Sequence, residues 1–198
     1  MLYISNLVVP EGYSIDILTI KDAKSISSGY NEAMKTSKAK YKIYLHQDVF
    51  IINKYFLINL LNIFKYNDRV GMIGMVGAPK IDESAIMWKS LRIGSLLKRQ
   101  HIDEKYIDEL YETPDSTGIV AVIDGLLMAT CIDIPWREDL FDGWDFYDMS
   151  QSMEFNKLGY LVVVPQQKYP WCLHDDGVVL NFLKYNHYRK IFIKEYMS

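Results

Sequence analysis

The sequence predicts a single α/β domain in which a mixed, mostly parallel sheet is flanked by helices. Three observations lead to this expectation. Apolar, β-branched segments alternate along the chain with segments of helical periodicity, the connections between them are short, and 198 residues is the length of one domain. Strand, helix and strand in close succession form a crossover unit, which places ligand chemistry at the carboxyl ends of the strands.

The first part of the chain supplies most of this pattern. Residues 14–20 alternate in polarity and are β-branched, which predicts a strand, and residues 26–36 have apolar positions at helical spacing behind a group of capping serines. A second strand is expected at 41–46. Asn53 is expected to cap an apolar helix that runs to Phe64, and the Gly-rich segment 70–76 reads as a third strand.

The second part is less regular. Residues 80–118 show no clear periodicity and end in the turn signal Thr113-Pro114-Asp115-Ser116, so we expect a long irregular stretch, a feature that is usually functional or mobile. The remaining expected elements are a strand at 118–123, an apolar run at 126–130, a helix at 147–158, a strand at 160–164 and an amphipathic helix at 178–196.

Composition restricts the class of protein. The net charge of −3 and the apolar content of 49% are ordinary for a globular chain and give no reason to expect a nucleic-acid partner. Cys131 and Cys172 lie far apart without metal-type spacing, which favours reduced thiols in a cytoplasmic protein. There is neither a secretion signal at the start nor an apolar run of the roughly 18 residues that span a bilayer, so we expect a soluble chain.

The sharpest chemical feature is a polar triplet, His46-Gln47-Asp48, that interrupts an apolar strand where it leaves the sheet. A carboxylate in this position can bind a hard cation whose remaining sites take phosphate oxygens. An isolated aspartate after a strand is more often a cap or turn residue. Two further polar clusters, at 141–148 and 172–177, carry the other groups that a metal-dependent transfer needs.

The order and content of these blocks resemble the bacterial glycosyltransferase-like proteins related to family 2, which have the GT-A fold of the nucleotide-diphospho-sugar transferases. The resemblance extends over nearly the whole chain from about residue 14. The blocks that carry it are Ser28-Gly29-Tyr30-Asn31-Glu32-Ala33, His46-Gln47-Asp48, Val122-Ile123-Asp124-Gly125-Leu126-Leu127-Met128-Ala129, the segment from Phe141 to Asp148, and His174 before Gly177.

The resemblance implies that residues 1–79 bind the nucleotide and the metal. Asp48 and His174 would hold Mn²⁺ or Mg²⁺, which bridges the two phosphates of a nucleotide-diphospho-sugar, with a UDP-sugar as the expected donor. Asn31 corresponds to an asparagine near the nucleotide base. His46 and Gln47 complete the donor side.

On the same resemblance, residues 80–198 form the acceptor side. Asp148 falls at the aspartate of a Glu-Asp motif and is the expected general base for an inverting transfer, with Asp145, three residues earlier, as the rival. The other acceptor-side residues are Asp124, Gly125, Trp144 and Tyr147. The acceptor is expected to be a glycan or a lipid-linked glycan of the kind used to build cell-surface polysaccharide.

Two residues depart from the pattern of that family. His46 stands where many relatives have aspartate, and a neutral imidazole supplies no charge to a hard cation, so an altered metal preference is expected. Tyr147 stands where relatives have glutamate. Its phenol can still form hydrogen bonds with a sugar hydroxyl.

The N-terminus departs as well, because relatives begin with a further apolar strand before the one expected here at 14–20. Either Leu2 to Val9 substitutes for that strand, or the nucleotide pocket is incomplete and the chain is a non-catalytic nucleotide-sugar-binding or assembly module. A missing central strand would leave an open edge, which favours a homodimer. A nucleotidyltransferase or phosphohydrolase is the third alternative, but the chain lacks the Gly-rich basic loop or clustered carboxylates that would favour it.

Basic and aromatic residues interleave near the C-terminus, where Lys184, Arg189, Lys190 and Lys194 alternate with apolar side chains. This spacing is compatible with docking on anionic lipid at the inner face of the membrane. An amphipathic helix packed on its own domain is the commoner explanation.

Overall fold

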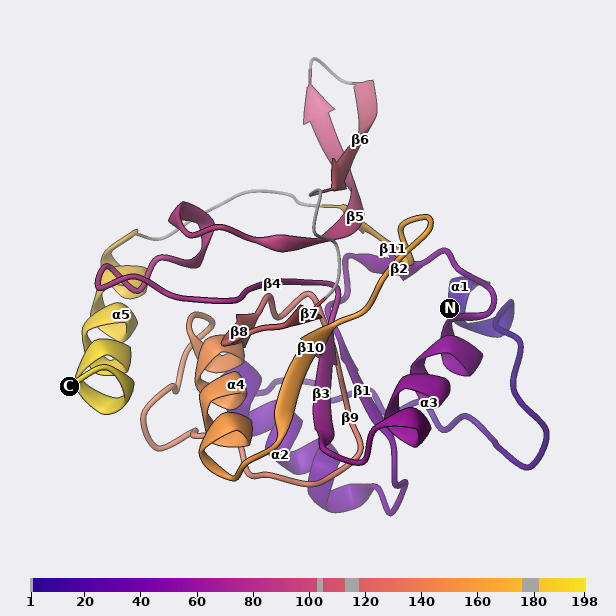
Figure 1. Ribbon diagram of the computed structural model, residues 1–198, viewed down its shortest axis with the longest axis horizontal. Coiled ribbons are helices and arrows are strands. Elements are labelled where there is room, and N and C mark those ends of the chain that lie inside the picture. The colour runs from indigo at the N-terminus through magenta and orange to yellow at the C-terminus, as the bar shows by residue number, and fades with distance from the viewer. Residues whose placement is uncertain (1, 103–104, 113–117, 176–181) are drawn as a thin grey trace.

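The computed structural model describes residues 2–102, 105–112, 118–175 and 182–198, and has a mixed α/β fold built on two sheets (Figure 1). The helices are α1 (Leu2–Ser5), α2 (Ile26–Thr36), α3 (Phe56–Tyr66), the 3-10 turn η1 (Met87–Lys89), α4 (Tyr147–Lys157) and α5 (Phe182–Tyr196). The strands are β1 (Lys42–Leu45), β2 (Val49–Ile51), β3 (Val70–Gly74), β4 (Val76–Ala78), β5 (Ile93–Ile102), β6 (Lys105–Glu112), β7 (Gly118–Ile119), β8 (Val122–Ile123), β9 (Leu127–Thr130), β10 (Leu161–Val164) and β11 (Cys172–Asp175).

The first sheet has the order β1-β9-β3-β10-β7 and lies between two layers of helices. On one face, Ile73 of β3 packs in a core cluster with Phe56 and Leu60 of α3. On the other face, Met72 of β3 packs with Phe155 of α4. Alternate residues of a strand point to opposite faces, so the continuous apolar run of β3 serves both layers.

The second sheet has the order β2-β11-β5-β4-β8, and the hairpin of β5 and β6 projects from it (Figure 1). Helix α5 covers a third core cluster, where Tyr185, Tyr188 and Phe192 pack with Phe141 and Phe146. The face of α5 that carries these three residues is therefore buried against the domain, as expected for an amphipathic helix that packs on its own domain. The expected helical residues 178–181 lie outside the described residues.

Several expected elements are confirmed. Helix α2 has the expected bounds and begins with a capping box, in which Ser25 and Ser28 bond each other's backbone N–H groups. Helix α4 and the strands β1, β9 and β10 match the segments predicted for them within two residues. The two cysteines are free, as expected.

The strand expected at 14–20 is wrong. These residues form no assigned element, and the side chains of Ile17 and Leu18 are 48% and 46% exposed. Strand β1, which follows α2, pairs antiparallel with β9 and with no other described strand, so the crossover unit lacks its first strand. The suggestion that Leu2 to Val9 supplies a strand is also wrong, because Leu2–Ser5 is helical.

The sheets are more antiparallel than predicted. Among the strand pairs that the structure describes, only β3 with β10 and β5 with β11 are parallel. The reason is β9, which inserts antiparallel between β1 and β3. Helix α3 also begins later than expected, because Asn53 accepts a hydrogen bond from the Tyr55 N–H and forms a turn instead of capping the helix.

The segment expected to be irregular contains the β5–β6 hairpin, and β11 was not predicted at all. The strand expected at 70–76 divides at Met75, where the chain passes from the first sheet to the second. The strand expected at 118–123 divides into β7 and β8 in the same way. The turn predicted at 113–116 lies outside the described residues. Within the described chain, no helix combines the length and the apolar character that crossing a bilayer requires.

Close packing at the point where the two sheets meet gives a stability prediction. A Cβ on Gly74, the last residue of β3, would lie 2.6–2.7 Å from three side-chain atoms of Ile123. We expect Gly74→Ala to destabilise the fold by about 1–3 kcal/mol, which corresponds to a drop in Tm of roughly 5 °C. Thermal unfolding followed by circular dichroism measures this, with the exposed Lys38→Ala as control. An unchanged Tm for Gly74→Ala would contradict the packing described.

Candidate active site

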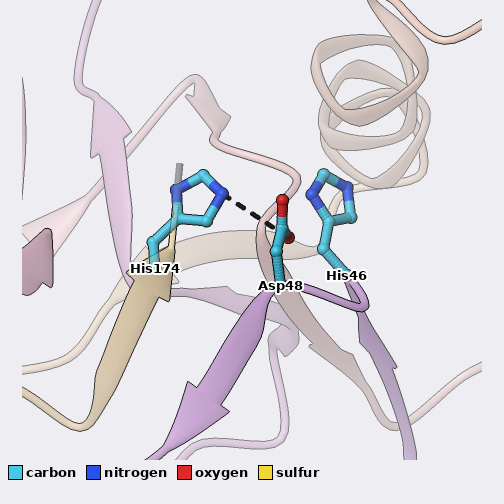
Figure 2. A group of neighbouring side chains, drawn as sticks. All are labelled: His46, Asp48 and His174. Atoms are coloured by element: carbon cyan, nitrogen blue, oxygen red, sulfur yellow. Dashed lines mark ion pairs between the residues drawn. The ribbon is translucent and has the colours of Figure 1, made fainter. Parts of the chain in front are cut away.

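Three metal-ligating side chains converge above the ends of β1, β2 and β11 (Figure 2). His46 follows β1, Asp48 precedes β2, and His174 lies in β11. Antiparallel pairing of β2 with β11 sets His174 opposite Val49, and the Asp175 N–H donates to the Asp48 carbonyl at 2.8 Å. One ligand atom from each of the three side chains lies within 4.8 Å of the others, and His174 Nε2 is 3.7 Å from Asp48 Oδ1.

These residues fit a divalent cation. Asp48 Oδ1 is buried and has no hydrogen-bond partner among the described residues, an arrangement that costs free energy unless a cation or water satisfies the oxygen. Burial lowers the pKa of His46, although the charges of Asp124 and Asp48 partly oppose this, so its imidazole is neutral and able to bind a metal. Two imidazole nitrogens and one carboxylate suit a transition ion such as Mn²⁺ better than Mg²⁺.

A hydrogen bond fixes the orientation of the His46 ring. Its Nε2 lies 2.5 Å from the hydroxyl oxygen of Tyr147, and its other ring nitrogen faces Asp48 (Figure 2). For that nitrogen, Nδ1, to bind a metal, the proton of the neutral ring must be on Nε2, which then donates to the Tyr147 oxygen. Partners of this kind select the tautomer of a ligating histidine and strengthen it as a ligand. Tyr147 therefore orients the His46 ring within the candidate metal site.

Gly125 makes room for this hydrogen bond. A Cβ at residue 125 would collide with the Tyr147 hydroxyl, so no other residue fits there without displacing the phenol. The Gly125 N–H also donates to Asp148 Oδ2 at 2.8 Å. The turn at Asp124 and Gly125 thus positions both Tyr147, beside the candidate metal ligands, and Asp148, the next residue in the chain.

Asp148 lies in the first turn of α4, and its pKa is the most strongly shifted among the carboxylates of this site. Its second oxygen, Oδ1, accepts a hydrogen bond from the Met149 N–H at 2.8 Å. Burial, and after it the charge of Asp124, raise the pKa of Asp148 to about 7, while the bonds from the backbone of Met149 and Gly125 act in the opposite direction. A carboxylate with a pKa near neutral is suited to take up a proton at physiological pH.

Asp145 lies outside α4, so it does not share a helix face with Asp148. Phe146 has φ of 62°, a left-handed conformation that is unusual for a bulky residue, and it separates Asp145 from the first turn of α4. Burial raises the pKa of Asp145, and Lys184 opposes this. The charges of Asp148 and Asp145 both raise the pKa of Tyr185, so the two carboxylates lie near the same phenol.

The other predicted site residues have different surroundings. Gln47 is exposed between the two ligands, and Trp144 is 60% exposed before α4, where it is free to contact an acceptor. Asp124 accepts a bond from the Leu126 N–H, and its charge acts on both His46 and Asp148. Asp176 and Gly177 lie outside the described residues.

Asn31, expected beside the nucleotide base, is buried in α2, and its amide is used within the protein. Its Nδ2 donates to the Trp136 carbonyl at 3.0 Å, and its Oδ1 accepts from the Trp136 N–H at 2.9 Å. This pair of bonds anchors α2 to the segment before α4. The amide of Asn31 therefore has a structural explanation that involves no nucleotide.

Sequence analysis assigned His46 to the donor side and not to the metal ligands, and it did not predict the bond of His46 to Tyr147. A signal was present, since these were the two residues that departed from the expected carboxylates. The structure brings the two departures into contact, which only the fold could reveal.

The chain matches a known protein family over nearly its whole length. The family model described as "Glycosyltransferase like family" matches residues 1–196. A search of curated proteins found no match.

The contact between His46 and Tyr147 can be tested by metal binding. We expect Tyr147→Phe, which removes the hydrogen-bond acceptor of His46, to weaken Mn²⁺ binding by about 10- to 100-fold. Titration calorimetry with Mn²⁺ measures this. Tyr196→Phe is the matched control, because it also loses hydroxyl hydrogen bonds, to Glu154 and Ser150, away from the cluster. Equal Mn²⁺ affinity in wild type and Tyr147→Phe would show that the phenol does not support the ligand.

Proposed function

The chain belongs to the glycosyltransferase-like family, and from this premise we propose that it is a metal-dependent glycosyltransferase. In this proposal it transfers a sugar from a nucleotide-diphospho-sugar, with a UDP-sugar as donor, to a hydroxyl of a glycan or lipid-linked acceptor. The observation that carries the proposal is the convergence of His46, Asp48 and His174 beside a turn that also holds Asp148. A lipid-linked acceptor would bring the reaction to the inner face of the membrane.

On the donor side, His46, Asp48 and His174 would hold Mn²⁺, and Gln47 would lie along the diphosphate. A bound divalent ion neutralises the negative charge that develops on the departing nucleoside diphosphate. The neutral His46 and Tyr147 keep further negative charge away from a ligand that is itself anionic. Three carboxylates, Asp48, Asp124 and Asp148, already lie close together and would repel a diphosphate. Two uncharged side chains beside them therefore support a diphosphate site here.

On the acceptor side, Asp148 would accept the proton of the attacking hydroxyl as that oxygen approaches the anomeric carbon in line with the leaving group. Direct displacement of this kind inverts the configuration of the sugar. Trp144 would pack on the acceptor, and Asp145 remains the rival base. The two backbone N–H groups on Asp148 hold its oxygens in place, so the acceptor must approach a fixed base.

The alternative is a non-catalytic nucleotide-sugar-binding module, and one observation favours it. Residues 14–20, which resemble part of the nucleotide-binding half, are exposed from 14 to 19 and pair with no described strand. Asp148→Asn distinguishes the two functions. Loss of transfer with donor binding retained supports the enzyme, whereas donor binding by a wild type that transfers sugar to no acceptor supports the module.

The three candidate metal ligands, two imidazoles and one carboxylate, predict a preference between metal ions. Titration calorimetry with UDP can measure it. We expect UDP to bind in the presence of Mn²⁺ at least about tenfold more tightly than with Mg²⁺, because imidazole nitrogens favour the softer ion. Asp48→Ala should abolish the metal-dependent part of the binding.

His46→Asp should shift the preference toward Mg²⁺, since it exchanges a nitrogen ligand for a charged oxygen. The control is His187→Asp, on the exposed face of α5. UDP binding that is indifferent to metal and to Asp48 would exclude the proposed centre.

The raised pKa of Asp148 predicts the pH dependence of transfer. A general base works when deprotonated, so kcat/KM should level off above pH 7 and fall about tenfold for each unit below it. Release of UDP in the presence of a glycan acceptor measures the rate. Asp148→Asn should remove nearly all activity, and Asp145→Asn should keep the acid limb of the profile. The opposite pattern in the two variants would assign the base to Asp145.

A further inference from the structure

A second hollow lies away from the candidate metal centre. It is open to solvent, has a volume of about 1140 Å³, and is lined by α3, the end of β10 and the loop at 165–171. The ladder of β2 and β11 connects it to the metal cluster, with Asp48 and His174 at one end. At the other end, the Ile52 N–H donates to the Trp171 carbonyl at 2.9 Å, and both residues line the hollow. None of the three candidate metal ligands lines it.

The hollow is large enough for more than one sugar ring. Small-molecule sites typically measure roughly 300–1,000 Å³, so this volume lies slightly above that range. It suits a short chain of linked rings better than a single small metabolite.

One stripe of α3 faces the hollow. Its lining positions are Tyr55 at the N-cap, Asn59, Asn62, Ile63 and Tyr66, which recur at i, i+4, i+7, i+8 and i+11 and so share a helix face. The opposite face of α3 carries the buried residues of the core. Tyr66 is 94% exposed, and a second lining tyrosine, Tyr169, is 72% exposed. Large aromatic rings thus stand around the hollow without being needed for the core.

Five side-chain amides line the hollow, four of them from asparagines. Asn53 Oδ1 accepts from the Tyr55 N–H at 2.9 Å, and Asn67 Oδ1 accepts from the Arg69 N–H at 3.0 Å, so the backbone orients both amides. Each keeps an NH₂ group without a partner in the described part of the chain. Asn59 and Asn62 form no side-chain hydrogen bond with any described residue.

The charges around the hollow exclude several ligands. Its described lining contains no carboxylate, which argues against a cation site, and its only charged side chains are Lys54 and Lys168. Each lysine lies over the ring of its neighbouring tyrosine, at 4.8 Å for Tyr55 and 5.8 Å for Tyr169. A lipid tail would leave the amides without hydrogen-bond partners. Two lysines paired with aromatic rings are also a weak basis for a polyanion.

A neutral saccharide matches this chemistry. The apolar C–H face of a pyranose ring packs on an aromatic side chain, while its hydroxyls both donate and accept hydrogen bonds. A carboxamide offers an acceptor oxygen and two donor hydrogens, so it can serve either role of a hydroxyl. We propose that this hollow binds a segment of oligosaccharide, which gives the domain a second glycan contact remote from the metal centre. The identity of the glycan as acceptor or product rests on the proposed function, but its binding in the hollow requires no metal.

The test uses the full chain and four neutral tetrasaccharides: chitotetraose, maltotetraose, cellotetraose and mannotetraose. Saturation-transfer NMR detects binding, and titration calorimetry measures its affinity. We expect at least one of the four to bind, with the same affinity in the presence of Mn²⁺ and of a chelator and in the Asp48→Ala variant. Separate titration with UDP and Mn²⁺ reports on the proposed function, so failure of either idea is recognised independently.

Two sets of variants locate the bound saccharide. Tyr66→Ala combined with Tyr169→Ala removes two exposed rings and should weaken saccharide binding by roughly tenfold or more, whereas Tyr13→Ala, outside the hollow, should not change it. The proposal is overturned if none of the tetrasaccharides binds, or if the double variant binds as wild type does. Loss of binding in Trp144→Ala but not in the double variant would place the saccharide at the acceptor side and overturn it as well.

Discussion

The hydroxyl of Tyr147 fills the space that a side chain at residue 125 would need, and both sides of the candidate site depend on this packing. From that position the hydroxyl contacts His46 and sets the direction of its ring toward Asp48. The backbone N–H of the same glycine holds Asp148. A single turn between β8 and β9 therefore contacts both Tyr147, which orients the candidate metal ligand His46, and Asp148, the candidate base.

The electrostatics of the site follow from having a neutral pair beside several carboxylates. Burial raises the pKa of Tyr147 and lowers that of His46, so both are uncharged at neutral pH. Asp124 already raises the pKa of Asp148, and a further acidic side chain at residue 46 or 147 would raise it more. Histidine and tyrosine at these two positions thus keep the pKa of Asp148 from rising further. Two of the three candidate metal ligands are consequently imidazoles.

The sequence predicted the helices well and the sheets less well, for a physical reason. Helix α2 follows from local periodicity and capping, which are properties of consecutive residues. Strand partners are set by contacts between distant segments, so the antiparallel insertion of β9 and the pairing of β11 with β5 had no local signal. At the site, Asp48 and His174 were predicted from their resemblance to a family and are close together in the fold. The role of Gly125 depends on the approach of Tyr147 in space, which no spacing in the sequence encodes.

The position of the three ligands at the junction of the two sheets has a mechanical consequence. His46 is attached to β1 of the first sheet, whereas Asp48 and His174 are attached to β2 and β11 of the second. An ion held by all three would therefore link the two sheets, and its binding free energy would add to the stability of the folded state. Resistance to heat and to proteolysis would then vary with the free concentration of the metal, so a cell depleted of that metal would lose the protein itself as well as its activity.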